Sequence, residues 1–333
     1  MPGRGRGWRI GYCLPEQKKR KLNFQDFEAL CRERGHEVVE LDLGRPLSPQ
    51  GPFDVILHKP SDLLLASDYD IHAQSLVDNF QTYTDTHART LVLDPLSSVR
   101  PLLDRFESCL LLRDLRAQDN SVFSPPCVEL PAGSGREALG QVLTRGLTFP
   151  LICKTRVAHG PDSHQMTLVF NEEGLGDVRG PCLLQSFVNH DAALFKVFVV
   201  GDAHFMVRRP SLKNFPRGQS ARGSIFFDSR EVSKPESCSR LTELEQAGPG
   251  PTPPAPSVVG RTVRGLRNAL GLSLFGVDLI VERQTGRCAA IDLNAFPGYE
   301  GVPEFFPALL SHIETLLETR EREEPPSSPP ETP

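Results

Sequence analysis

The first hundred residues alternate between short apolar segments and amphipathic segments. In the first amphipathic segment Phe24, Phe27 and Cys31 recur at helical spacing, and Gly35 is placed to end the helix. Strands are predicted over residues 8–13, 36–43, 53–59 and 90–94, and helices over residues 22–34 and 70–83. We expect a basic loop between the first strand and the first helix. This alternation predicts an α/β domain with a largely parallel sheet.

Beyond residue 100 strands follow one another with few helices between them, which is typical of an α+β arrangement. Helices are predicted over residues 100–115, 136–144 and 258–270, and strands over residues 149–155, 166–170, 182–188, 195–200, 204–208 and 225–227. Gly201-Asp202 predicts a hairpin turn. Residues 248–256 are rich in proline and predict an exposed loop. From Arg320 the chain is charged and then rich in Pro and Ser, so we expect a disordered tail.

Composition and charge narrow the class of protein. No apolar run approaches the roughly 18 to 20 residues of a membrane-spanning helix, so we expect no membrane insertion. The net charge of −5 gives no general basis for binding nucleic acid. The basic N-terminus is not followed by a signal-peptide core, which predicts a cytoplasmic protein. The eight cysteines form no Cys-x-x-Cys pair, so we expect reduced core thiols rather than disulfides or zinc ligands.

Residues 275–298 predict a β-hairpin that carries oxygen ligands on one face. Gln284-Thr285-Gly286 is a three-residue loop with Gly where positive φ is most needed. With Thr285 at its centre, Asp278 and Asp292 lie opposite each other, and Asn294 projects from the same face. Opposed carboxylates repel unless a divalent cation lies between them, so the three side chains predict a Mg²⁺ site. We also expect Asp292→Ala to abolish activity and to stabilise the ligand-free protein.

A single strand-end Asp more often caps a turn or pairs with an Arg, but three ligands at this spacing favour the metal. Lys154 and Lys196 each interrupt an apolar β run, where a lysine must reach a cleft or an exposed edge. The loop of residues 157–164, with its two histidines, could fold over phosphates. Lys18, Lys59 and the cations of residues 208–213 could line a pocket for a polyanion. The absence of a Walker A motif and of a GxGxxG segment disfavours P-loop and Rossmann sites.

Several long stretches resemble one family. They are GYCLPEQKKRKLNFQDF, ICKTRVAHGPDSHQM, LLQSFVNHDAALFKVFVVG, RRPSLKNF, SIFFDS, LFGVDLIV and AIDLNAFPGYEGVPEFF. The chain resembles the inositol 1,3,4-trisphosphate 5/6-kinases, also called inositol-tetrakisphosphate 1-kinases, from about residue 8 to residue 318. The resemblance implies an ATP-grasp fold: an N-terminal α/β domain, and central and C-terminal α+β domains that clasp ATP between two β-sheets. The implied boundaries are 1–98, 99–189, 190–319 and a tail, 320–333.

The same resemblance implies which residues meet each ligand. Those around ATP are Arg105, Lys154, Gln185 through Lys196, Ser211, Ser229 and Ser233. Those that hold two Mg²⁺ ions are Asp278, Asp292 and Asn294. Those that face the inositol phosphate are Lys18, Lys59, His164, Lys196, Arg209, Asn294 and Gly298. Lys196, His164 and Asp292 are the catalytic candidates.

The predicted activity is transfer of the ATP γ-phosphoryl group to a soluble inositol polyphosphate by a monomeric enzyme. The acceptor is inositol 1,3,4-trisphosphate at its 5- or 6-hydroxyl, inositol 3,4,5,6-tetrakisphosphate at its 1-hydroxyl, or both. Charge neutralisation and positioning would carry the catalysis, and His164 is either a clamp or a base. Two alternatives remain: an ATP-grasp carboxylate-amine ligase, and an inactive module that binds inositol phosphates. The concentration of basic residues disfavours the ligase, and the intact metal and lysine set disfavours the inactive module.

Overall fold

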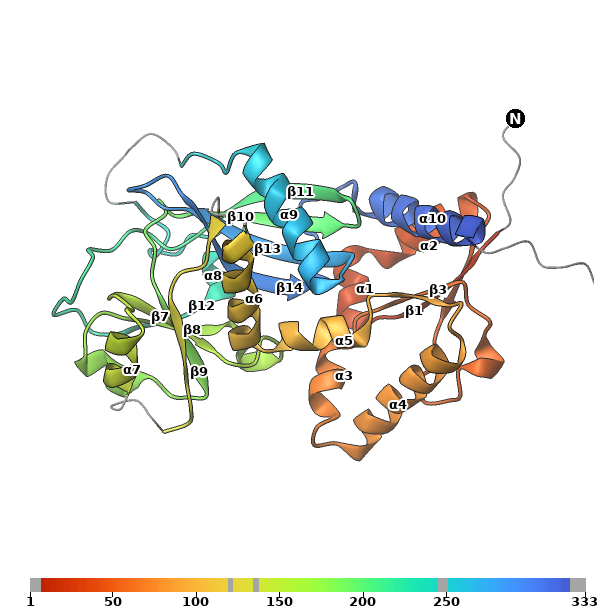
Figure 1. Cartoon of the computed structure of the whole chain (residues 1–333), viewed down its shortest axis with the longest axis horizontal. Coiled ribbons are helices and arrows are strands. Elements are labelled where there is room, and N and C mark those ends of the chain that lie inside the picture. Colours follow the sequence, from red (N-terminus) through yellow and green to blue (C-terminus); the bar gives the residue numbers. More distant parts are fainter. Residues whose placement is uncertain (1–6, 119–121, 134–137, 245–250, 324–333) are drawn as a thin grey trace, which may run out of the picture. The chain divides into compact units, whose positions relative to one another are not determined.

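The computed structural model describes residues 7–118, 122–133, 138–244 and 251–323 (Figure 1). The chain forms two compact units. Unit 1 contains residues 1–94, 200–203 and 298–333, and unit 2 contains residues 95–199 and 204–297. The three-domain division inferred from the sequence stays a prediction.

Unit 1 is built on a four-stranded sheet in the order β2-β1-β3-β4, and all its strand pairs are parallel, as predicted. The strands are β1 (Arg9–Cys13), β2 (Glu37–Glu40), β3 (Val55–His58) and β4 (Leu91–Leu93). The helices are α1 (Glu16–Leu22), α2 (Phe24–Glu33), α3 (Ser61–Ala66), α4 (Ile71–Thr86) and α10 (Phe305–Glu323), with a 3₁₀ turn η1 (Ser48–Gln50). β3 is buried along its whole length, and its first three residues, Val55, Ile56 and Leu57, are all apolar.

The basic segment after β1 is helical, so the predicted loop is wrong. α1 begins after Pro15 with Glu16 in its first turn, and three basic residues lie in its last turn. This charge distribution complements the helix dipole. Asn23, with φ of 53°, ends α1 and separates it from α2. Lys18 is therefore held on a helix rather than on a loop.

The first sheet of unit 2 has the order β11-β10-β13-β14-β5. Its strands are β5 (Val122–Phe123), β10 (Ala193–Val200), β11 (Ala203–Pro210), β13 (Leu274–Val281) and β14 (Cys288–Ala295). The helices that accompany this sheet are α5 (Leu96–Val99), η2 (Arg100–Leu103), α6 (Arg105–Gln118) and α9 (Pro256–Leu270). α6 packs against both β14 and α9 (Figure 1). α6 therefore carries its first residue, Arg105, to the side of β14.

The second sheet of unit 2 has the order β12-β8-β7-β9-β6, and its pairs are antiparallel. Its strands are β6 (Cys127–Leu130), β7 (Leu151–Thr155), β8 (Gln165–Val169), β9 (Cys182–Ser186) and β12 (Ile225–Asp228). The helices are α7 (Ala138–Thr144), α8 (Ser229–Val232), η3 (Pro161–His164) and η4 (Glu173–Asp177). The two sheets give unit 2 the predicted α+β character. The sequence did not predict β5, β6, α3, α5, α8 or α10.

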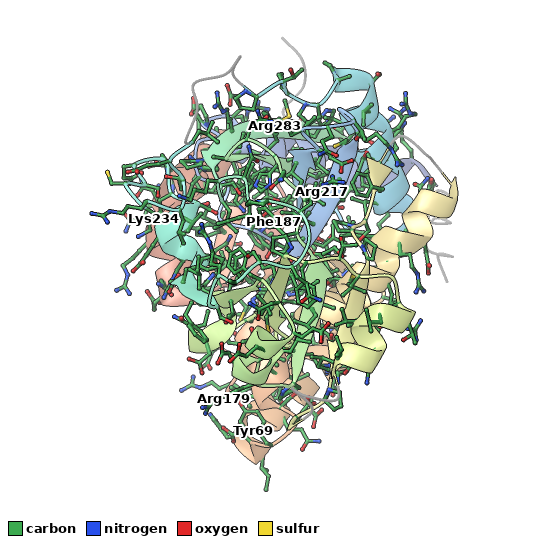
Figure 2. All side chains as sticks on the ribbon, turned by 90° about the vertical axis from the view of Figure 1, so that its left-hand side faces the viewer. Tyr69, Arg179, Phe187, Arg217, Lys234 and Arg283 are labelled. Atoms are coloured by element: carbon green, nitrogen blue, oxygen red, sulfur yellow. A yellow bond between two sulfur atoms is a disulfide. The ribbon has the colours of Figure 1, made fainter. Side chains whose placement is uncertain are left out.

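Side chains fasten the segment after β11 to this second sheet. Phe187 packs on a buried cluster that includes Phe170 and Phe215. Figure 2 shows Phe187 among other side chains, while Lys234 points outward from the segment after α8. Asn189 holds the backbone of Phe215 through two hydrogen bonds, of 2.8 and 2.9 Å. The residues that follow β11 are thereby held in a defined position.

The β13–β14 hairpin has the predicted pairing at its two aspartates, and it contains a bulge that was not predicted. Asp278 lies opposite Asp292, and Gly286 in the turn has φ of 68°. Nearer the turn, Leu279 pairs with Ala290, so the ladder there is shifted by one residue. Ile291 is the extra residue, and it restores the register at the two aspartates.

One expectation about the cysteines is wrong. Cys109 on α6 and Cys127 on β6 form a disulfide. The two cysteines are 18 residues apart in the sequence, and no motif marks them as a pair. Cys13, Cys31, Cys153, Cys182, Cys238 and Cys288 are free thiols, as expected.

The C-terminal prediction needs a correction at its start. Residues 320–323 belong to α10, where the guanidinium of Arg320 donates to the carbonyl of Ala88. The rest of the predicted tail lies outside the described residues. Residues 251–255 of the proline-rich segment have no helix or strand, and Pro256 begins α9. Within the described part of the chain, no helix is both long and apolar enough to cross a membrane.

Candidate functional site

The site in unit 2 is built around the two aspartates of the β13–β14 hairpin. Because they are directly opposite on an antiparallel pair, their side chains project from the same face. Asn294 lies two residues further along β14, and its Nδ2 atom donates to Asp292 Oδ2 at 3.3 Å. The sequence-predicted triple is therefore brought together. It places carboxylate and amide oxygens on a rigid floor.

Each aspartate has a cationic partner from another element. Lys196 on β10 places Nζ 3.0 and 2.7 Å from the two carboxylate oxygens of Asp278. Arg105, at the start of α6, donates from Nη1 to Asp292 Oδ1 at 3.0 Å and from Nη2 to the carbonyl of Ser163 at 2.8 Å. The Arg105 and Asp278 side chains retain only 6% and 12% of their exposure. These are therefore largely desolvated charge pairs.

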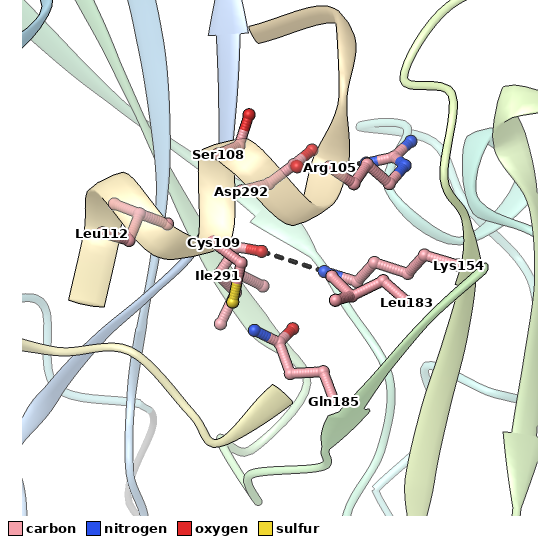
Figure 3. Close-up of a pocket in the computed structure, with 9 residues that line it drawn as sticks. All are labelled: Arg105, Ser108, Cys109, Leu112, Lys154, Leu183, Gln185, Ile291 and Asp292. Atoms are coloured by element: carbon pink, nitrogen blue, oxygen red, sulfur yellow. Dashed lines mark hydrogen bonds and ion pairs between the residues drawn. The ribbon is translucent and has the colours of Figure 1, made fainter. Parts of the chain in front are cut away.

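The bulge in β14 has a direct role in holding Lys154. Ile291 has no Cα partner in the β13 ladder, and its carbonyl accepts a 2.9 Å hydrogen bond from Lys154 Nζ. Figure 3 shows this bond across a small cavity between β7 and β14. The cavity is lined by Arg105, Ser108, Cys109, Leu112, Lys154, Leu183, Gln185, Ile291 and Asp292. Four predicted ligand residues, Arg105, Lys154, Gln185 and Asp292, thus share one pocket.

Burial and neighbouring charges set the ionisation of this group. Burial lowers the pKa of Lys154 to about 8, although Asp292 opposes the shift. Burial raises the pKa of Asp278 above its ordinary value, against the opposing charge of Lys196. Burial also acts to raise the pKa of Asp292, but Arg105 and Lys154 outweigh it and hold that pKa below its ordinary value. Asp292 is accordingly a carboxylate at neutral pH.

The donor set fits Mg²⁺. This ion binds proteins through one or two carboxylates and takes its remaining ligands from waters and phosphates. Asp278, Asp292 and Asn294 supply two carboxylates and an amide oxygen. Across the described ranges, no group of three or more His, Cys, Asp or Glu residues could hold a metal.

His164 lies at the end of η3, close to α8. Its Nδ1 atom is 3.3 Å from the hydroxyl of Ser229, a predicted ATP residue. Asp228 caps α8 by accepting from the backbone of Arg230, and the Arg230 guanidinium lowers the pKa of that carboxylate. Ser233 ends the same short helix. The loop that carries His164 is thus adjacent to two predicted nucleotide residues.

Ser211 lies just beyond β11 and is buried beside His190. His190 contacts the carbonyl of Val188 through Nδ1 at 2.6 Å and the hydroxyl of Ser211 through Nε2 at 2.7 Å. Since a carbonyl only accepts, Nδ1 carries the proton and the Ser211 hydroxyl donates to Nε2. Arg209 is buried on β11, two strands from Asp278 in the same sheet.

Three predicted acceptor residues belong to unit 1. Lys18 on α1 lies with its Nζ 5.8 Å from the centre of the Tyr299 ring. Burial lowers the pKa of Lys18 well below its ordinary value, and the neighbouring charge of Lys59 lowers it further. Burial also lowers the pKa of Lys59 to about 8, while Asp62 and Glu300 oppose the shift. Gly298 lies two residues before Glu300, and a Cβ at position 298 would lie 2.1 Å from a carboxylate oxygen of Glu300.

Comparison with known proteins places the chain in a family. A model of the "inositol 1,3,4-trisphosphate 5/6-kinase ATP-grasp domain" matches residues 116–315, and one of the "pre-ATP-grasp domain" of the same kinases matches residues 9–99. The chain belongs to the inositol 1,3,4-trisphosphate 5/6-kinase family. This confirms the resemblance inferred from the sequence motifs.

Curated relatives in this kinase family match nearly the whole chain. Inositol-tetrakisphosphate 1-kinase of Xenopus laevis is 51% identical over 316 residues, which are 94% of this chain and 80% of the relative. The Danio rerio protein of the same name is 49% identical over the same shares of the two chains. Inositol-tetrakisphosphate 1-kinase 4 of Glycine max is 32% identical and covers 93% of this chain and 89% of its own.

Solved structures confirm the predicted ATP-grasp fold. D-alanine–D-alanine ligase from Bacillus anthracis matches with a TM-score of 0.56 at 14% identity, over 96% of this chain and all of that one. The ATP-grasp ligase PsnB, solved with a minimal precursor, matches with the same TM-score and identity over 92% of this chain and 99% of its own. At this identity the likeness concerns the fold alone.

Several contacts of the predicted ligand residues were not predicted from the sequence. The Ser163 carbonyl, the Ile291 carbonyl and the His190 imidazole each contact a predicted ligand residue. Backbone carbonyls leave no trace in residue type. His190 could have been found, because a histidine between apolar strand residues needs buried hydrogen-bond partners.

Proposed function

We propose that the protein transfers the γ-phosphoryl group of ATP to a hydroxyl of a soluble inositol polyphosphate. The acceptors are inositol 1,3,4-trisphosphate, at its 5- or 6-hydroxyl, and inositol 3,4,5,6-tetrakisphosphate, at its 1-hydroxyl. The observation that carries this proposal is the convergence of three cations on the β13–β14 hairpin, where Arg105 and Lys196 pair with the two aspartates and Lys154 donates to the Ile291 carbonyl. The chain is also about 50% identical to inositol-tetrakisphosphate 1-kinases. A monomeric state and a cytoplasmic location remain predictions.

The charged residues have distinct tasks in this mechanism. Asp278, Asp292 and Asn294 would hold two Mg²⁺ ions, which neutralise phosphate charge when bound. Lys154 and Arg105, which both line the pocket in Figure 3, bind the nucleotide phosphates. Lys196 neutralises the charge that develops on the transferred group, and His164 contacts the acceptor. Because phosphoryl transfer passes through a loose transition state, fixed cations supply most of the stabilisation.

The nucleoside and the acceptor are assigned to separate residue sets. Gln185, Ser211, Ser229 and Ser233 surround the nucleotide. The residues of unit 2 assigned to the acceptor are His164, Lys196, Arg209 and Asn294, and those of unit 1 are Lys18, Lys59 and Gly298. Cationic side chains suit an acceptor that carries several phosphates, whereas the acceptor of a carboxylate-amine ligase carries far less charge.

The test is turnover with Mg-ATP and a panel of inositol tris- and tetrakisphosphates, with products separated by anion exchange. Phosphorylation of inositol 1,3,4-trisphosphate is expected. Asp278→Asn should abolish transfer, and Asp177→Asn, at an exposed position on η4 in the same unit, should not. Wild-type protein that binds the inositol phosphates but transfers nothing would instead favour the inactive module.

A further inference from the structure

The carboxylates of the proposed metal site are already paired with cations of the chain itself. Lys196 contacts both oxygens of Asp278, and Arg105 contacts one oxygen of Asp292. A Mg²⁺ ion would need these oxygens, because carboxylates are the protein ligands it binds most strongly. Metal binding must therefore compete with the two internal charge pairs.

Arg105 is incompletely satisfied in this position. Its Nη1 and Nη2 atoms donate to Asp292 and to the Ser163 carbonyl, but its buried Nε atom has no hydrogen-bond partner within the described structure. A buried donor without an acceptor costs free energy. An anion beside the guanidinium would supply the missing acceptor. The guanidinium of Arg105 would therefore be more completely hydrogen-bonded beside a phosphate than it is in the ligand-free protein.

The local charge balance disfavours the metal alone. Three cationic side chains, Arg105, Lys154 and Lys196, lie around two carboxylates, which leaves a net positive charge when all are ionised. A divalent ion that entered without an anion would add to this excess in a desolvated site. A nucleotide that brings several negative charges reverses the balance.

We propose that Arg105 and Lys196 are internal counter-ions, which a divalent cation displaces from Asp292 and Asp278 and which then bind the nucleotide phosphates. Binding of metal alone is consequently weak, and metal and nucleotide each strengthen the binding of the other. The identity of the nucleotide rests on the proposed function. Arg105 is the counter-ion of Asp292 in the ligand-free state and a phosphate ligand in the loaded state.

The test measures metal binding without nucleotide, with Mn²⁺ as a spectroscopic probe and Mg²⁺ as its competitor. Arg105→Gln removes the competitor for Asp292 and should tighten nucleotide-free Mn²⁺ binding at least about tenfold, the equivalent of one charged hydrogen bond. The same variant should weaken Mg-ATP binding by a similar factor. Arg113→Gln, at an exposed position on α6, is the matched control and should change neither affinity.

The decisive result is the crossover, in which Arg105→Gln tightens nucleotide-free Mn²⁺ binding and weakens Mg-ATP binding. An Arg105→Gln protein that binds Mn²⁺ no more tightly than the wild type, while circular dichroism shows it folded, would overturn the proposal. If that variant does not fold, Lys196→Gln gives the same test at Asp278. The titration needs no inositol phosphate and no turnover. A crossover in a protein without kinase activity would defeat only the proposed function, and kinase activity without a crossover would defeat only the counter-ion proposal.

Discussion

Replacing Asp292 with alanine should lower the stability of the ligand-free protein, which reverses the expectation drawn from the sequence. The sequence places Asp278 and Asp292 opposite each other, and two bare carboxylates there would repel. In the structure Asp292 is an ion-pair partner of Arg105, whose side chain is only 6% exposed. Asp292→Ala therefore removes an attraction as well as a repulsion.

The two energies can be compared. Carboxylates on directly opposed strand positions, about 5 Å apart, repel by about 3 kcal/mol at an effective dielectric constant of about 20. Charge centres about 4 Å apart, as in the Arg105 pair, attract by about 4 kcal/mol on the same scale. Lys154 and Lys196 add further attraction to Asp292, and Lys196 also neutralises Asp278. The loss of attraction is therefore larger, and we expect a net destabilisation of about 2 kcal/mol.

The measurement must report on unit 2. The single tryptophan, Trp8, belongs to unit 1, so its fluorescence is unsuitable. Calorimetry and far-ultraviolet circular dichroism of the ligand-free protein should show a transition lowered by about 4 to 8 °C for a unit of this size. A double-mutant cycle with Arg105→Gln isolates the pair, because the double variant should lose less than the sum of the single ones.

Two results would refute this reasoning. The first is an Asp292→Ala protein that melts at or above the wild-type temperature, which would mean that repulsion from Asp278 dominates. The second is an additive cycle, which would mean that Arg105 and Asp292 do not interact in solution. Neither result would touch the kinase proposal, since turnover is measured separately.

The other predictions concern ligand binding and the C-terminus. Lys154→Met should weaken ATP binding about ten- to a hundredfold, whereas His164→Ala should weaken only the binding of the inositol phosphate, by a similar factor. Calorimetric titration of each variant with each ligand measures both affinities. Because the pKa of Lys154 is about 8 without ligand, nucleotide binding at pH 8 should take up about half a proton, which calorimetry in buffers of different ionisation enthalpy measures and Lys154→Met should remove. Deleting residues 324–333 should leave the melting temperature unchanged, whereas deletion from Arg320 onward should lower it, since the bond to the Ala88 carbonyl is lost.

The β13–β14 hairpin shows which features of the site could be predicted from the sequence and which could not. The predicted pairing of Asp278 with Asp292 is confirmed, but the register assumed near the turn is wrong by one residue. The bulge at Ile291 compensates for that error. A bulge depends on the backbone hydrogen bonds of both strands, so alternation of apolar residues could not reveal it. The bulge also explains how Lys154 finds a carbonyl acceptor.

Contacts between elements that are distant in the sequence could not be predicted. The α/β pattern of unit 1 and most strands of unit 2 followed from local periodicity. The disulfide between Cys109 and Cys127 did not, because it depends on how α6 packs beside β6. α1 could have been predicted, since an acidic residue such as Glu16 suits the first turn of a helix and basic residues suit its last turn.

Two buried lysines of unit 1, Lys18 and Lys59, have lowered pKa values that affect the stability of the fold. Burial lowers the pKa of Lys59 to about 8 from an ordinary value of 10.5. Between those two values the unfolded chain holds more protons than the folded one, so stability rises with pH through this window, and at neutral pH the charged lysine costs stability. Lys18 has the same direction of shift, and Lys59 contributes to it. A bound polyanion would raise both pKa values and recover that cost. Lowered lysine pKa values of this kind are common where a protein binds an anion, and the assignment of Lys18 and Lys59 to the acceptor stays a prediction.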